Sequence, residues 1–213
     1  MIRVSCKDLQ QVKNDPALYA ANLVSNGKPQ ARRGMFSQWQ TAARELHTDK
    51  LTIADASNRL STLFSVWNDT TQNRNRQEFF HQALISYNDL FEKKGFIYRH
   101  GSHLMKWQLH KNIILGGYTP WIVSKGKDHF SYLFTEHDLD WESELRFPLL
   151  QQYVSKKIIE CDTADMEIGV FSLESGRFRF RSFTEKEISA AKSETQYLFN
   201  KLNGEYLRRK SIS

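Results

Sequence analysis

The sequence predicts an α/β (α+β) fold, with helices flanking a central mixed sheet and a helical segment at the N-terminal end. Three observations support this. Apolar residues recur at helical spacing through the first 92 residues, and the period then shortens towards two between residues 96 and 135. After residue 135, a helix, a β-hairpin and a final helix are expected. Strands that cluster in this way are typical of a partly antiparallel sheet and not of a βαβαβ nucleotide-binding fold.

The composition indicates a globular protein with a substantial core. The chain has 213 residues, of which 40% are hydrophobic and 13% aromatic, so a disordered protein is excluded. No apolar run approaches the roughly 18 residues of a membrane-spanning helix, and the first residues lack the apolar region of a secretory signal. We therefore expect a cytoplasmic protein without a membrane partner. Cys6 and Cys161 are far apart and have no CxxC partner, which argues against a disulfide scaffold or a zinc ribbon.

Capping signals predict where the first helices begin. Ser5 followed by Asp8 resembles a capping box that opens a short helix. Asp15 is expected to cap the next helix, in which Pro16 takes the first position, because proline lacks the N–H group that this position leaves unpaired.

Apolar spacing predicts two further helices over residues 35–46 and 52–67. The polar segment 68–75 that follows is the best candidate for an internal linker. We therefore expect an N-terminal helical segment, residues 1–70, packed on an α/β core formed by residues 76–213.

The core is expected to begin with a strongly amphipathic helix over residues 76–92, ended by Gly95. Strands with glycine-containing turns follow at 96–99, 104–115, 118–123 and 129–135. A helix is then expected over residues 142–159.

The last part of the chain reads as a hairpin and a long helix. Residues 166–173 and 177–183 are expected to pair across a turn that contains glycine. Thr184 and Glu187 form a capping box for a final helix that reaches about residue 207.

The formal net charge of +6 is unevenly distributed. No acidic residue lies between Lys93 and Lys127, whereas the stretch from Asp128 to Glu144 contains no Lys or Arg. The basic stretch is typical of a surface that binds phosphates, and the acidic stretch of a metal-binding loop. The alternative is that both are solvated faces that attract each other across a sheet.

Potential ligands cluster at the end of a predicted strand. Glu136, Asp138 and Asp140 fall on one side of an extended chain, and His137 lies between them. Such residues suit Mg²⁺ or Mn²⁺, although a polar loop exposed to solvent would have the same composition. The phosphate-loop, GxGxxG, GxSxG and HExxH motifs are absent.

Several segments together carry a resemblance to a known family. They are Val4–Leu9 with Asn14–Tyr19, Arg33–Gln38, Leu115–Ile122, Tyr132–His137, Arg146–Tyr153 and Glu167–Phe171. They resemble segments of the PD-(D/E)XK nuclease-like superfamily, in its RecB and CRISPR-adaptation branch. In the order given, the first three resemble its S-x-x-x-L…P-x-x-Y opening, its G-x-x-x-H helix start and its G-x-x-D strand. The other three resemble its I-I-D-x-K strand, the helix whose Gln and Tyr support the site, and its closing strand. The resemblance covers nearly the whole chain and implies a restriction-endonuclease-like core.

The chain departs from that family at the positions that carry its chemistry. Gln38 stands in place of the His, Thr119 or Pro120 in place of the first metal-binding Asp, Thr135 in place of the second, and His137 in place of the Lys. In an active member, two carboxylates hold the metal that activates water, and Thr has no anionic oxygen to replace them. The resemblance therefore implies either a fold retained for binding or a site whose carboxylates have shifted.

The leading hypothesis is a catalytically degenerate nuclease-like protein that binds nucleic acid, DNA rather than RNA, or assembles into a larger complex. It would act in DNA processing, on a mobile element or in phage defence, and would need no cofactor. Trp107, Tyr118 and Trp121 could stack on bases, although core packing is the alternative for each. The predicted nucleic-acid-binding residues are Lys106, Lys111, Trp121, Lys125, Lys127, Arg177, Arg179 and Arg181.

Two alternatives stay open. The first is an active Mg- or Mn-dependent DNA nuclease with a migrated site. Its catalytic residues would be Glu136, His137, Gln151 and Gln152, and its metal ligands Glu136, Asp138 and Asp140. The second is a protein-interaction module without a nucleic-acid role. The sequence thus leaves enzymatic activity open, and the degenerate motifs favour its absence.

Overall fold

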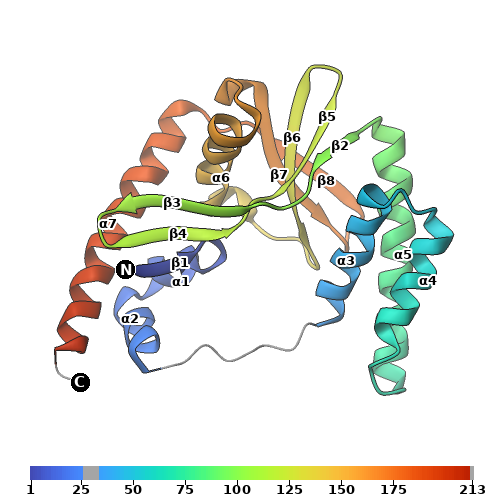
Figure 1. Cartoon of the computed structure of the whole chain (residues 1–213), viewed down its shortest axis with the longest axis horizontal. Coiled ribbons are helices and arrows are strands. Elements are labelled where there is room, and N and C mark those ends of the chain that lie inside the picture. Colours follow the sequence, from blue (N-terminus) through green and yellow to red (C-terminus); the bar gives the residue numbers. More distant parts are fainter. Residues whose placement is uncertain (26–33, 212–213) are drawn as a thin grey trace.

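In the computed structural model, which describes residues 1–25 and 34–211, helices enclose two β-sheets (Figure 1). In spatial order, the strands of the larger sheet are β2 (Ile97–His100), β5 (Trp121–Lys125), β6 (Asp128–Thr135), β7 (Met166–Ser172) and β8 (Arg177–Arg181). Strands β6 and β7 are parallel, whereas the other neighbours are antiparallel. The smaller sheet has the order β1 (Ile2–Ser5), β4 (Ile113–Tyr118) and β3 (Leu104–His110), with β1 parallel to β4. The predicted α+β class with a mixed sheet is confirmed.

The chain begins with a strand and not with the capped helix that Ser5 and Asp8 predict. Ile2 and Val4 are buried, because β1 lies beside β4 and directs alternate side chains into the core. Ser5 makes no capping hydrogen bond and precedes only a short 3₁₀ turn. The capping-box prediction at this position is therefore wrong.

Helices α1 (Leu9–Asn14) and α2 (Pro16–Ser25) follow. The backbone N–H of Leu18 donates a hydrogen bond to Asp15 Oδ1 at 2.8 Å, and α2 starts at Pro16 as predicted. Both helices pack against the long C-terminal helix α7 (Glu185–Lys210), whose predicted capping box between Thr184 and Glu187 is present.

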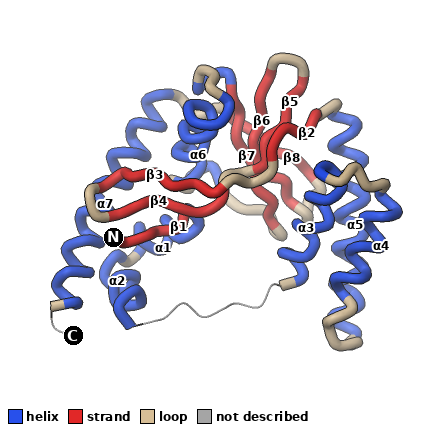
Figure 2. The backbone as a smooth tube through the Cα atoms, in the orientation of Figure 1, coloured by secondary structure: helices blue, strands red, loops and turns tan. Residues whose placement is uncertain are grey.

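Three further helices lie at the end of the molecule opposite α7 (Figure 2). They are α3 (Met35–Thr48), α4 (Ile53–Phe64) and α5 (Thr71–Lys94). The first and the third pack on the larger sheet, and the second packs against those two helices. Helix α5 begins earlier than predicted, because Thr70 caps it by accepting a hydrogen bond from Asn73 N–H at 3.2 Å. Much of the expected linker 68–75 is therefore helical. Gly95 ends the helix with φ +67°, as predicted.

Two predicted boundaries are corrected in the second half. Residues 104–115 form a hairpin and not a single strand, because the chain turns at Lys111 and Asn112, where Asn112 N–H donates to His110 Nδ1 at 3.1 Å. Helix α6 (Arg146–Val154) starts later than residue 142 and continues through a π-helical turn, Ser155–Ile159. The hairpin of β7 and β8 is confirmed.

Residues 1–25 and 34–70 lie at the two opposite ends of the molecule (Figure 1). The first 25 residues pack with the smaller sheet and α7, whereas α3 and α4 pack with α5 and the larger sheet. Although α5 and α7 are long, no helix in residues 1–25 and 34–211 has an apolar stretch that could span a membrane.

A chain of buried and half-buried polar groups lies between α3, α5 and the larger sheet. His47 Nε2 and the Tyr87 hydroxyl are 2.8 Å apart, and the hydroxyls of Tyr87 and Tyr132 are 2.7 Å apart. Burial lowers the pKa of His47 to about 4 and raises the pKa of both tyrosines. The imidazole is therefore neutral at neutral pH and forms part of the core.

Acid is expected to destabilise the fold through His47. Between about pH 6.5 and pH 4 the unfolded chain binds a proton at this residue that the folded chain does not bind, so stability falls as the pH is lowered through this window. We expect a loss of about 2 to 3 kcal/mol from this residue by pH 4. Urea unfolding of the wild-type protein and of His47→Gln across this range measures it. An equal pH dependence in both proteins would contradict the assignment.

Candidate functional site

The loop after β6 carries the predicted metal ligands, but arginines from other elements neutralise two of them. Glu136 Oε2 lies 2.6 Å from Arg76 Nη2 on α5. Asp138 Oδ1 lies 3.7 Å from Arg179 Nη2 on β8. Hydrogen bonds from Ser172 and Ser175, and then the arginine charges, lower the pKa of Asp138.

The remaining members of this predicted site also stay apart. His137 is 75% exposed and lies 3.6 Å from Glu174, and Asp140 is exposed. Nowhere in the described ranges do three or more His, Cys, Asp or Glu side chains gather closely enough to hold a metal ion. The described structure therefore does not bring the expected metal site together.

Gln151 is fully buried, and its side-chain amide forms hydrogen bonds with two segments that are distant in sequence. Its side-chain nitrogen donates to the carbonyl oxygens of Thr163 at 2.9 Å and Phe183 at 3.1 Å, and to Ser182 Oγ at 3.1 Å. Its Oε1 accepts from Phe183 N–H at 2.8 Å. The Oε1 of Gln152 is buried and has no partner among the described residues. The structure thus gives Gln151 a role in joining α6 to the segment before α7.

The arginines predicted to bind nucleic acid from β8 are largely engaged within the protein. Arg179 pairs with Asp138, and its Nη2 donates to the carbonyl oxygen of Leu139 at 2.8 Å. Arg181 bridges Glu142 at 3.3 Å and Glu187 at 2.6 Å. Three carboxylates of the acidic stretch, Glu136, Asp138 and Glu142, therefore pair with arginines of α5 and β8 and not with the basic stretch that precedes them in sequence.

The other predicted nucleic-acid-binding residues do not form one surface. Trp121 is only 7% exposed and packs edge-on against Phe134, which corrects its assignment as a freely stacking residue. Lys106 and Lys111 are exposed on the smaller sheet, whereas Lys125 and Lys127 are exposed at the tip of the β5–β6 hairpin. The turns of these two hairpins point in different directions (Figure 1).

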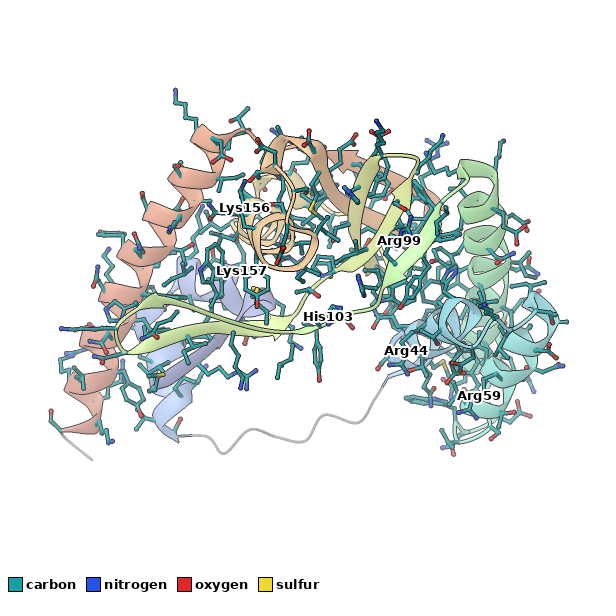
Figure 3. The ribbon with its side chains drawn as sticks, turned by 45° about the horizontal axis from the view of Figure 1, so that its top comes forward. Arg44, Arg59, Arg99, His103, Lys156 and Lys157 are labelled. Atoms are coloured by element: carbon teal, nitrogen blue, oxygen red, sulfur yellow. The ribbon has the colours of Figure 1, made fainter. Side chains whose placement is uncertain are left out.

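A cleft of about 1300 Å³ lies where the two ends of the molecule meet. One wall comes from β1 with the turn after it, α1 and α2, and the other from α3. The end of β4, the starts of β5 and α6, and β6 contribute the remaining lining. Arg44 on α3 and the loop that carries Ser102 and His103 border this cleft from the side of the larger sheet (Figure 3).

The cleft is cationic. Among the described residues that line it, Arg3, Lys7, Arg44 and Arg146 carry positive charge, and Asp8 is the only carboxylate. Arg146 Nε pairs with Glu144 at 2.7 Å. Within residues 1–25 and 34–211, no ion pair forms at the other three, and all three are exposed. Their guanidinium and ammonium groups are therefore free to meet an anion.

Arg3, Lys7 and Arg44 were not predicted as binding residues, since they belong to neither the acid-free stretch nor the Arg-Phe alternation of β8. No local spacing marks these residues, which come from β1, the turn after it and α3. The segments quoted for the nuclease resemblance, however, do point to this place. Residues from most of them line the cleft, namely Ser5–Asp8, Tyr19, Ser37, Gly116–Thr119, Tyr132–Phe134 and Arg146.

A buried hydroxyl and an exposed aromatic ring also line the cleft. Thr119 Oγ1 is buried and accepts a hydrogen bond from His103 N–H at 2.8 Å. Tyr118 is 69% exposed beside it. Of the three aromatic residues considered for stacking, Trp107 packs partly buried against Tyr153, and Trp121 is buried, so Tyr118 is the accessible one.

Comparison of the sequence with known protein families and with curated proteins finds no match.

Proposed function

We propose that this protein binds nucleic acid in the central cleft and holds it without cleaving it. The observation that carries the proposal is the charge of the cleft, where four of the described lining residues are cationic and one is a carboxylate. Arg and Lys side chains bind phosphates with charge-assisted hydrogen bonds, and their affinity comes largely from counterion release. A hydrolytic Mg²⁺ site would instead need converging oxygen ligands.

The proposal includes a degenerate PD-(D/E)XK-like, restriction-endonuclease-like origin for this cleft. Its support is that most of the segments that carry this resemblance line one cavity, and that Thr119, one of the two positions where the family would have its first aspartate, the other being Pro120, is among the lining residues. A neutral hydroxyl that already accepts a hydrogen bond from the backbone is a poor substitute for a metal-binding carboxylate. We favour DNA over RNA, a cytoplasmic setting, and a role in DNA processing, on a mobile element or in defence, alone or within a larger complex.

Removing the cleft cations is expected to weaken binding strongly. Fluorescence anisotropy with labelled DNA and RNA of about 20 nucleotides would compare the wild-type protein with Arg3→Ala/Lys7→Ala/Arg44→Ala at about 50 and about 200 mM salt. We expect the triple variant to bind at least about tenfold more weakly and to show a shallower salt dependence, since fewer counterions are released. The wild-type affinity itself should fall as salt rises.

A variant with an equal loss of charge supplies the control. Lys93, Lys186 and Lys210 are exposed or near the surface, lie outside the cleft and form no ion pair in the part of the chain that the structure describes. Their triple replacement by alanine should have little effect. Equal weakening in both triple variants, or no binding by the wild-type protein at low salt, would sink the proposal. Oligonucleotides incubated with Mg²⁺ or Mn²⁺ should remain intact, and cleavage that Glu136→Ala abolishes would favour the migrated nuclease site.

Tyr118 is expected to contribute a stacking contact. Base–aromatic stacking is worth about 1 to 3 kcal/mol per base, so Tyr118→Ala should weaken binding by about fivefold or more. Because the ring is 69% exposed, the melting temperature should change little. Tyr197→Ala, at a position 57% exposed on α7, is the matched control and should leave the affinity unchanged. Unaltered binding by Tyr118→Ala would exclude this contact.

A further inference from the structure

Pairing between β1 and β4 places Arg3 beside a glycine of the cleft. The parallel register sets Arg3 opposite Ile114 and Ser5 opposite Gly116. Both Arg3 and Gly116 line the cleft. Gly116 is buried within β4, where an ordinary side chain would be expected to support the strand.

The Arg3 side chain occupies the space that a side chain at Gly116 would need. A Cβ atom at Gly116 would lie 2.7 Å from Arg3 Nε and 3.4 Å from both Cγ and Cζ of the same residue. The guanidinium therefore lies directly over the bare backbone of β4. The nearest atoms belong to a long, exposed side chain and not to the backbone, so a methyl group at this position would displace Arg3 and leave the strand in place.

We propose that Gly116 is a positioning residue, whose missing side chain lets the Arg3 guanidinium lie against β4 and face a phosphate group in the cleft. This inference rests on the proposed nucleic-acid binding. It also accounts for glycine within a strand, where it lowers stability relative to a residue with a side chain. The residue acts through Arg3 and does not itself contact the ligand.

The test is a double-mutant cycle of Gly116→Ala, Arg3→Ala and the combined variant, with a labelled DNA oligonucleotide as the probe. We expect each single variant to weaken binding by about fivefold and to reduce the salt slope by about one phosphate equivalent. The combined variant should bind about as well as Arg3→Ala alone, because a displaced guanidinium and a missing guanidinium are equivalent at the site. A merely structural defect would not change the salt slope in this way.

Stability and a second glycine provide the controls. Gly116→Ala should unfold at the same denaturant concentration as the wild-type protein or a higher one, since Ala disfavours the unfolded chain relative to Gly. Gly204→Ala on α7, where a Cβ would meet no described atom within 4 Å apart from the nearby backbone of its own helix, should leave binding unchanged. If Arg3→Ala weakens binding but Gly116→Ala does not, or if the two losses add, the positioning role is wrong and the proposed function stands. If no cleft variant changes binding, the proposed function itself fails.

Discussion

Replacing Gly169 with alanine is expected to destabilise the protein by about 3 to 5 kcal/mol, enough to threaten folding. Gly169 lies in β7, between β6 and β8, opposite Tyr132 and Phe180. A Cβ at this position would overlap the carbonyl oxygen of Arg179 and would lie 2.9 Å from Phe180 Cα. These atoms belong to the backbone of β8, which cannot move aside without breaking its hydrogen bonds to β7.

Denaturant unfolding monitored by circular dichroism measures this effect. Gly204→Ala is the matched control, because it makes the same chemical change in a helix where, apart from the nearby backbone of that helix, a Cβ would meet no described atom within 4 Å. It should stabilise the protein by about 0.5 to 1 kcal/mol. A Gly169→Ala variant within about 1 kcal/mol of the wild-type protein would show that β8 can shift, contrary to this packing.

The Gln151→Ala substitution should cost about 3 kcal/mol of folding stability, because it leaves several buried groups without partners. The Phe183 N–H and the carbonyl oxygens of Thr163 and Phe183 each lose the hydrogen bond that the Gln151 amide supplies. Their burial prevents water from replacing it without rearrangement. The contacts of α6 with η4 (Thr163–Asp165) and with residues 182–183 before α7 should loosen, and hydrogen exchange should rise first at these two places.

The neighbouring glutamine separates this structural role from a catalytic one. Gln152→Ala removes a side chain of the same size from the same helix, and its buried Oε1 has no partner among the described residues. We expect its effect on stability to be below about 1 kcal/mol. Unfolding free energies from urea titration would compare the two variants. If the Gln151→Ala and Gln152→Ala variants had equal free energies of unfolding, the hydrogen bonds of Gln151 would not contribute the stability predicted for them.

Features encoded over a few neighbouring residues were predicted well. Thr184 and Glu187 satisfy each other's backbone groups, and Gly95 takes a left-handed conformation, so these helix ends can be read from residue type alone. Strand β1 was missed for the opposite reason. Its four residues are too few to show a period, and its partner β4 lies about half the chain away. The first strand is recognised only in the tertiary structure, where it pairs with Ile113 and Leu115 of β4.

The candidate site shows the same division between local and distant information. The acidic loop after β6 resembles a metal site in sequence, but Arg76 and Arg179 arrive from α5 and β8 to neutralise it. Trp121 looks available among basic residues, yet it packs against Phe134 inside the fold. The segments that carry the nuclease resemblance were the better guide, since residues from most of them line the cleft, although Glu136, His137, Gln151 and Gln152, first chosen from them as catalytic residues, do not.

Residue order alone was enough to establish an α+β protein, most of its helix boundaries and an uneven charge. Such properties follow from amphipathic spacing and capping, which act between residues close in sequence. Which charges are neutralised and which remain free depends on contacts between distant elements. Spacing along the chain does not report these contacts, because Coulomb attraction and packing depend on distance in space. Folding pairs Glu136 and Asp138 of the acidic loop with arginines and brings Arg3, Lys7 and Arg44 together around one cleft.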